Sequence, residues 1–141
     1  MRILSIDFGT KRIGVAVSDA LGITAQGLPT VPHENKNQVF RALAGICAEY
    51  RVGEVLIGLP VNMDGSFGPK ANEILTLAPE LERELKIPVK TWDERLTSRQ
   101  AGRLMIEQGL SRQKQKDTSD RLAATLLLQS YLESKRSTSG V

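Results

Sequence analysis

The sequence predicts an α/β protein built on a five-stranded mixed sheet with helices on both faces. Two observations carry this prediction. Apolar segments of strand length recur along the 141 residues, and amphipathic segments with helical spacing separate the later ones. No internal repeat, low-complexity segment or linker interrupts the pattern. We therefore expect one domain over residues 1–136, followed by a disordered tail over residues 137–141.

The first three strands are predicted within the first 31 residues. Residues 2–7 and 13–18 are apolar and are joined by a short turn that contains Gly9. Residues 23–31 supply the third strand. Connections this short join antiparallel neighbours, so the three strands are expected to form a meander.

Helices and strands alternate in the middle of the chain. Residues 35–50 carry apolar side chains at helical spacing and predict the first helix, and residues 54–58 form a short apolar strand. A second helix is predicted over residues 70–86. We expect a kink or a break at Pro79, because a proline inside a helix removes a hydrogen bond and clashes with the preceding turn. Residues 89–92 are the fifth strand.

The C-terminal third is predicted to be helical. Residues 97–100 have the form of a capping box and open a helix that ends at Gly109. Residues 111–116 are polar and basic and are expected to form a loop, and residues 118–134 form the last helix. Three strands, a helix, a strand, a helix, a strand and then helices is the element order of the ribonuclease H-like fold.

Composition and charge narrow the function classes. The hydrophobic share of 40% and the charged share of 25% are typical of a soluble globular protein. No apolar run approaches the roughly 20 residues of a membrane span, so we expect a cytoplasmic protein without a membrane partner. The single cysteine, Cys47, excludes an internal disulfide and is expected to be a buried, inert thiol. The net charge of +3 is only weak evidence for a polyanionic partner.

The segment around Asp7 is the most informative part of the chain. Asp7 ends an apolar strand, Gly9 allows a close turn, and a hydroxyl and two cations follow at Thr10, Lys11 and Arg12. A carboxylate beside a hydroxyl and cations suits metal and phosphate chemistry. An ordinary Asp-Gly turn at the end of a strand is the alternative explanation.

Two further acids occupy comparable positions. Glu94 follows the fifth strand, although Asp93 is a rival, and alternation along a strand puts these two side chains on opposite sides. Asp120 lies in the first turn of the last predicted helix and shares a stripe with Ala124, on the face that must pack inward. Asp117 is expected to be the N-cap of that helix, with Asp120 as the ligand.

These acids predict a divalent-metal site. The first and fourth strands of a mixed sheet are commonly neighbours at its centre, so the strand-end and helix-start acids can converge over one edge. Two Mg²⁺ or Mn²⁺ ions need hard oxygen ligands, and such a pair activates water and stabilises the leaving oxygen of a phosphodiester. His33 and Cys47 are badly placed to hold zinc.

Polar and basic residues near these acids predict contacts with the phosphates of a nucleic acid. The predicted substrate-binding residues are Thr10, Lys11, Arg12, Arg95, Thr97, Arg99 and Lys116. The loop that starts at Gly58 is also suited to lining a substrate cleft, or is a simple connector.

Four segments together resemble the YqgF (RuvX) family of ribonuclease H-like nucleases, from Met1 to about residue 133. They are residues 6–14, residues 58–60 with 64–65, residues 93–97 and residues 120–132. The resemblance implies a catalytic and metal-binding triad of Asp7, Glu94 and Asp120. It also implies a divalent cation and a role in processing the 5′ end of precursor 16S rRNA. Resolution of Holliday junctions in branched DNA is the other activity associated with relatives, and a homodimer is an open possibility.

Two other classes of protein share features of this sequence. The actin and sugar-kinase ATPases share an Asp-x-Gly-Thr loop, but they need a duplicated two-lobed fold, and this chain has room for one lobe. A nucleic-acid-binding or ribosome-maturation module without catalysis also fits the sequence. The presence of all three acids favours the nuclease.

Overall fold

The computed structural model describes residues 1–93 and 112–139, of which 112–121 and 136–139 are described by their backbone alone. Its strands are β1 (Arg2–Phe8), β2 (Arg12–Ser18), β3 (Ala25–Pro32), β4 (Val52–Leu59) and β5 (Val89–Asp93). Its helices are α1 (Lys36–Tyr50), α2 (Pro69–Leu85) and α4 (Arg112–Ser139). The helix predicted over 97–109 lies outside the described residues.

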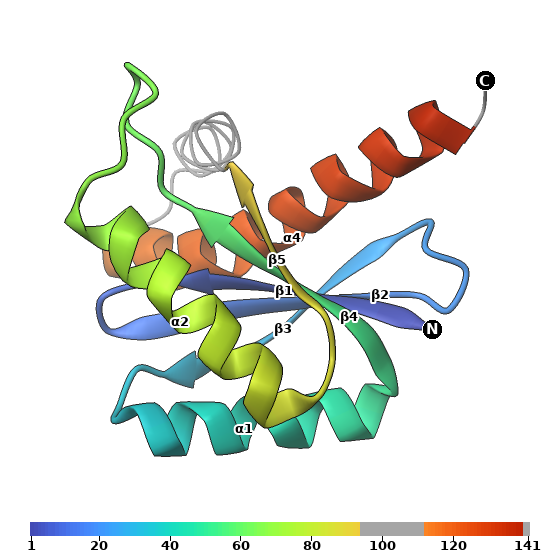
Figure 1. The fold of residues 1–141 in the computed structure, drawn as a ribbon, viewed down its shortest axis with the longest axis horizontal. Coiled ribbons are helices and arrows are strands. Elements are labelled where there is room, and N and C mark those ends of the chain that lie inside the picture. The colour runs from blue at the N-terminus through green and yellow to red at the C-terminus, as the bar shows by residue number, and fades with distance from the viewer. Residues whose placement is uncertain (94–111, 140–141) are drawn as a thin grey trace.

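The strands form one mixed sheet in the order β3-β2-β1-β4-β5 (Figure 1). β1, β2 and β3 pair antiparallel, as the predicted meander requires, whereas β4 pairs parallel with both β1 and β5. The parallel strands β1, β4 and β5 therefore end at the same edge of the sheet. The five-stranded mixed sheet predicted from the sequence is confirmed, with β1 and β4 side by side.

Helices cover both faces of the sheet. Leu4, Ile6 and Phe8 of β1 belong to the core beneath α1 and α2. Ile3 packs into a second core beneath α4, and Ser5 faces the same way, because its Oγ donates a hydrogen bond of 2.7 Å to the carbonyl of Ala124. This alternation defines two faces, called here the α1/α2 face and the α4 face.

Local signals explain where the first two helices begin. The Asn35 side chain accepts a hydrogen bond from the backbone N–H of Gln38 and caps α1, and Pro69 occupies the first turn of α2, where its missing N–H costs nothing. The break considered at Pro79 is wrong, because α2 continues through it. Ala78 and Leu81 are buried on either side of the proline, and their packing holds the helix together there.

The last helix is longer than its sequence predicts. α4 begins at Arg112, so residues 112–116 are helical rather than a loop, and Asp117 lies inside the helix and does not cap it. The helix also continues to Ser139, into the predicted tail. Residues 112–117 contain no glycine or proline, and Arg, Gln and Lys favour helices, so polarity alone was a poor reason to predict a loop.

The thiol of Cys47 has the surroundings that the sequence predicts. Cys47 is buried as expected, and loss of hydration raises the pKa of its thiol to about 11, which leaves it protonated and unreactive.

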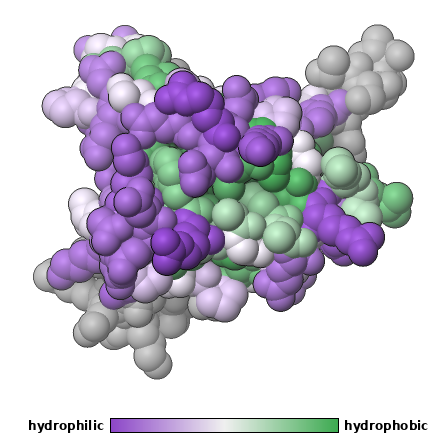
Figure 2. All heavy atoms as spheres, turned by 60° about the horizontal axis from the view of Figure 1, so that its bottom comes forward, coloured by the Kyte–Doolittle hydropathy of each residue, from purple (hydrophilic) through white to green (hydrophobic). Residues whose placement is uncertain are grey.

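In residues 1–93 and 112–139, no helix has the length and apolar character needed to cross a bilayer. On the face shown in Figure 2, hydrophilic side chains dominate the left side and hydrophobic ones gather toward the centre and right.

A cluster of charged and aromatic side chains fastens α4 to the sheet. The Tyr131 hydroxyl donates a hydrogen bond to the carboxylate of Glu54, and the Lys90 ammonium lies 3.1 Å from the same carboxylate. The Tyr131 ring also packs edge-on against Trp92, at 5.1 Å between centroids. Burial raises the pKa of Glu54, but the hydrogen bonds from Tyr131 and Lys90 and the charge of Lys135 outweigh burial and lower it overall.

Replacing Tyr131 with Phe is expected to lower the free energy of unfolding by about 1–3 kcal/mol at neutral pH, because a hydrogen bond to a carboxylate is lost. The lowered pKa of Glu54 means that its contribution is complete above the ordinary glutamate pKa and disappears as the pH falls through the folded-state value. The difference between the variant and wild type should therefore shrink in acid. Urea denaturation between pH 3 and pH 7 measures it, with Tyr50→Phe as the control. A difference that does not change with pH would contradict this assignment.

Candidate active site at the end of strand β1

Asp7 lies at the edge of the sheet where the parallel strands end. It is the next-to-last residue of β1 and is half-buried. Alternation along β1 places its side chain on the α4 face with Ile3 and Ser5, because Ile6 and Phe8 belong to the opposite core. A carboxylate held by a central strand is a rigid group, as a ligand or catalytic residue requires.

Glycines flank Asp7 on both neighbouring strands. Asp7 pairs with Gly14 of β2, and Ile6 pairs with Ile57 of β4, so Gly58 is the next residue of β4 alongside Asp7. By alternation, both glycines are on the α4 face, where they present no side chain. Neither neighbouring strand therefore places a side chain of its own beside the carboxylate.

Gly58→Ala is expected to reduce nuclease activity about tenfold to a hundredfold, because the added methyl group lies beside Asp7 on the α4 face, where it crowds the proposed position of the substrate phosphate. The control is Gly45→Ala in α1, where an added Cβ meets no atom within 4 Å. Cleavage rates and melting curves of both variants measure the effect, and full activity of Gly58→Ala would show that this position is not used.

Helix α4 brings its first half to the same edge of the sheet. The hydrogen bond from Ser5 to the carbonyl of Ala124 places Ala124 beside the middle of β1. Leu132 lines a cavity with Met1 and Ile3 at the start of β1. The helix therefore runs antiparallel to β1, and its N-terminal half lies toward the end of β1 (Figure 1).

Position 120 lies one helical turn before Ala124, and position 117 lies two turns before it, on the same side of the helix. The backbone thus brings both positions toward Asp7. Because Asp117 is not an N-cap, it stays a rival for the helix-borne ligand. The prediction of Asp120 rests on the stripe that it shares with the buried Ala124 and on the family motif.

Asp93, the alternative to Glu94 as a ligand, lies at the end of β5 on the α1/α2 face of the sheet. Trp92 packs against Tyr131 of α4, so the next residue, Asp93, belongs to the opposite face. The register agrees, since Asp93 pairs with Leu59, whose side chain is in the α1/α2 core. Asp93 therefore does not share a face with Asp7. Glu94 lies outside the described residues.

The structure describes the side chains of three predicted phosphate-binding residues and the backbone of a fourth. Thr10 and Lys11 are exposed in the turn after β1, and Arg12 begins β2 on the same face as Gly14. Lys116 belongs to α4 rather than to a loop. The remaining predicted contacts are outside the described residues: Arg95, Thr97 and Arg99.

The loop after β4 carries an aromatic residue that the sequence analysis did not identify as functional. Val61 and Phe67 form an isolated bridge, and Asp64 accepts hydrogen bonds from the side chain and backbone N–H of Ser66, which lower the pKa of Asp64. Phe67 is 50% exposed despite this local order. Its position in a polar, turn-rich segment, outside any apolar periodicity, was the available signal.

Asp7 is the one member of the predicted triad whose side chain the structure describes. Within the described residues, no three His, Cys, Asp or Glu side chains gather closely enough to hold a metal ion. What Asp7 itself offers is a carboxylate held at the end of a central strand, and oxygen is the donor that Mg²⁺ and Mn²⁺ prefer. This end of β1 thus fits a hard divalent cation.

Comparison with known proteins gives a consistent family match. The family model RuvX, described as a Holliday junction resolvase, matches residues 1–134. A protein of Clostridium kluyveri named "Putative pre-16S rRNA nuclease" is 45% identical over 133 residues, which cover 94% of this chain and 97% of the relative. A protein of the same name from Clostridium novyi (strain NT) is 47% identical over 134 residues, covering 95% and 99%.

Solved structures agree on the fold. RuvC of Thermus thermophilus in complex with a Holliday junction substrate aligns with a TM-score of 0.55 at 19% identity, covering 99% of this chain and 96% of RuvC. The fowlpox virus resolvase with Holliday junction DNA aligns with a TM-score of 0.57 at 19% identity, covering 96% and 99%. The ribonuclease H-like fold predicted from the element order is confirmed.

Proposed function

The chain belongs to the RuvX family of nucleases, and we propose that it cleaves precursor 16S rRNA near its 5′ end with the help of divalent metal ions. The observation that carries the proposal is the position of Asp7. Its carboxylate is held at the edge where the parallel strands end, between two glycines, and on the face toward which α4 brings position 120.

The proposed site assigns a role to each predicted residue. Asp7, Glu94 and Asp120 would hold two Mg²⁺ or Mn²⁺ ions, which when bound supply an activated water and stabilise the leaving oxygen. Gly14 and Gly58, which carry no side chain, flank Asp7 on the neighbouring strands, where the phosphodiester would approach.

The predicted polar and basic residues would hold the substrate backbone. Such contacts fix the position of a nucleic acid without reading its sequence. The residues concerned are Thr10, Lys11, Arg12, Arg95, Thr97, Arg99 and Lys116.

Precursor rRNA is preferred over branched DNA as the substrate because of the closeness of the matches. The relatives named for pre-16S rRNA are 43–47% identical over nearly the whole chain, whereas the resolvases seen with Holliday junctions are 19% identical. Junction resolution is the second candidate, supported by the description of the family model. Paired cuts in a four-way junction would use two copies of the chain, so a homodimer belongs to this candidate.

Cleavage of two labelled substrates tests the proposal. Wild-type protein is incubated with 5′-labelled precursor 16S rRNA and with a four-way DNA junction, in Mg²⁺, in Mn²⁺ or in EDTA. We expect cleavage of the precursor with either metal and none in EDTA. Cleavage of the junction alone would favour the second candidate. Binding of either substrate without cleavage would replace the nuclease with a non-catalytic module.

Phe67→Ala is expected to weaken binding of single-stranded RNA by about fivefold to a hundredfold, because an exposed aromatic ring on the loop that follows β4 can stack on a base. Leu75→Ala, which removes an exposed apolar side chain from α2, is the matched control. Fluorescence anisotropy with a labelled oligonucleotide measures both affinities. Equal losses in the two variants would show that Phe67 makes no specific contact.

A further inference from the structure

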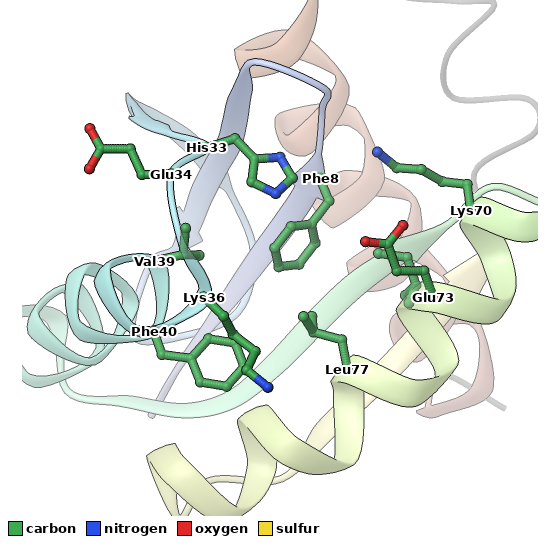
Figure 3. Close-up of a pocket in the computed structure, with 10 residues that line it drawn as sticks. Phe8, His33, Glu34, Lys36, Val39, Phe40, Lys70, Glu73 and Leu77 are labelled. Carbon is green, nitrogen blue, oxygen red and sulfur yellow. The ribbon is translucent and has the colours of Figure 1, made fainter.

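A cavity of about 250 Å³ lies on the α1/α2 face of the sheet, beside Phe8 at the end of β1 (Figure 3). Phe8, the residue after Asp7, forms one wall. Apolar side chains of α1 and α2 form the others, including Phe40 and Leu77. Because Asp7 and Phe8 point to opposite faces of one strand, the cavity and the candidate active site are separated only by the end of β1.

The rim of this cavity is attached to the turn that follows Asp7. His33 lies with its Nδ1 2.6 Å from the carbonyl oxygen of Gly9, and its ring meets that of Phe8 edge-on at 6.1 Å between centroids. A carbonyl can only accept, so Nδ1 is the donor of this hydrogen bond. This contact fixes the rim relative to the strand that carries the catalytic carboxylate.

The charged side chains around the cavity differ in whether they point toward it or away from it (Figure 3). The carboxylate of Glu73 points from α2 toward Phe8, and Lys70 extends toward the side occupied by His33, whereas Glu34 points away (Figure 3). Lys36 is paired with Glu80 at 2.7 Å. The cavity therefore offers aromatic and aliphatic walls, one inward acceptor, and a cation at its opening.

We propose that this cavity receives one unpaired nucleobase with an exocyclic amino group, from the strand whose phosphate lies at Asp7. The proposal rests on the proposed nuclease function and adds a base-specific subsite to it. The volume is just below the roughly 300–1,000 Å³ of typical small-molecule sites, which suits one base better than a whole nucleotide. Proteins commonly read RNA through such splayed-out bases, with aromatic contact and hydrogen bonds to the base edge.

Each polar group then has a definite partner. Glu73 accepts a hydrogen bond from the amino group of adenine, cytosine or guanine, as carboxylates do with cytosine N4 in DNA grooves. Uracil has no amino group, and the one donor on its pairing edge, N3–H, lies between two carbonyl oxygens, which the carboxylate repels. Lys70, at the opening, is placed to meet a phosphate on the path of the strand between the cavity and Asp7.

Binding of eight-residue oligouridylates with a single central A, C, G or U tests the proposal. Affinities are measured by fluorescence anisotropy in EDTA, so that cleavage does not interfere. Wild type should bind the three oligomers with an amino-bearing base about tenfold more tightly than the all-uridine oligomer. Glu73→Ala should abolish this preference, and Glu84→Ala, on an exposed part of the same helix, should keep it.

A second pair of variants tests the cavity itself. Leu77→Trp fills it and should remove the preference, whereas Leu75→Trp on the exposed side of α2 should not. Equal binding of all four oligomers by wild type, or a preference that survives both Glu73→Ala and Leu77→Trp, would overturn the subsite and leave the nuclease untouched. Failure to bind any of the oligomers would overturn the subsite, and the nuclease would then be judged by its cleavage assay.

Discussion

Asp7→Asn is expected to reduce the cleavage rate about a thousandfold, because losing one ligand from a metal centre removes several kcal/mol of transition-state stabilisation. An amide keeps the size of the side chain but not its charge. The fold should persist, since Asp7 lies at the end of a strand whose other residues form the core. Single-turnover cleavage of precursor 16S rRNA measures the loss.

Two controls separate catalysis from folding. Asp19→Asn makes the same change at the other end of β2 and keeps an oxygen for the backbone N–H groups of Ile23 and Thr24, so its activity should be unchanged. Without metal, Asp7→Asn should melt at or above the wild-type temperature, because neutralising one acid of the proposed triad relieves repulsion among the three carboxylates. A clearly lower melting temperature would identify Asp7 as a structural turn residue.

Asp120→Asn is expected to lose activity to a similar extent, about a thousandfold, if Asp120 is the helix-borne ligand. Asp117→Asn is the matched control, because positions 117 and 120 both lie on the part of α4 that is directed toward Asp7. It should retain most activity. The same cleavage assay, with melting curves of both variants, makes the comparison.

If Asp117→Asn loses activity and Asp120→Asn keeps it, the identity of the helix-borne ligand changes, but the metal-dependent mechanism stands. An inactive Asp117→Asn beside a fully active Asp120→Asn would make Asp117 the third acid. Full activity in both variants, together with full activity of Glu94→Gln, would contradict a metal site built from these acids.

Most of the fold could be predicted because the sequence signals there are periodic. Alternating and continuous apolar segments defined the strands, and the spacing of Val39, Leu43 and Cys47 defined α1. The errors came where local chemistry gave weak or misleading signals. Pro79 is tolerated because its neighbours are buried, and the polar start of α4 carries no residue that opposes a helix.

The site was predictable only in part, because its residues are brought together by the sheet. Asp7 could be identified from its place between a strand and a glycine turn. The flanking by Gly14 and Gly58 depends on strand register, which no local pattern reveals. The cavity behind Phe8 needs the packing of α1 against α2, and the exposure of Phe67 depends on a loop bridge.

Direct titration of Mn²⁺ tests the central claim that the end of β1 is a metal site. Isothermal calorimetry on metal-free wild type and on Asp7→Asn, with Asp19→Asn as the control, compares their affinities without any substrate. We expect Mn²⁺ to bind wild type and Asp19→Asn alike and to bind Asp7→Asn at least about tenfold more weakly, the effect of losing a charged ligand. Equal affinity in all three proteins would contradict the account.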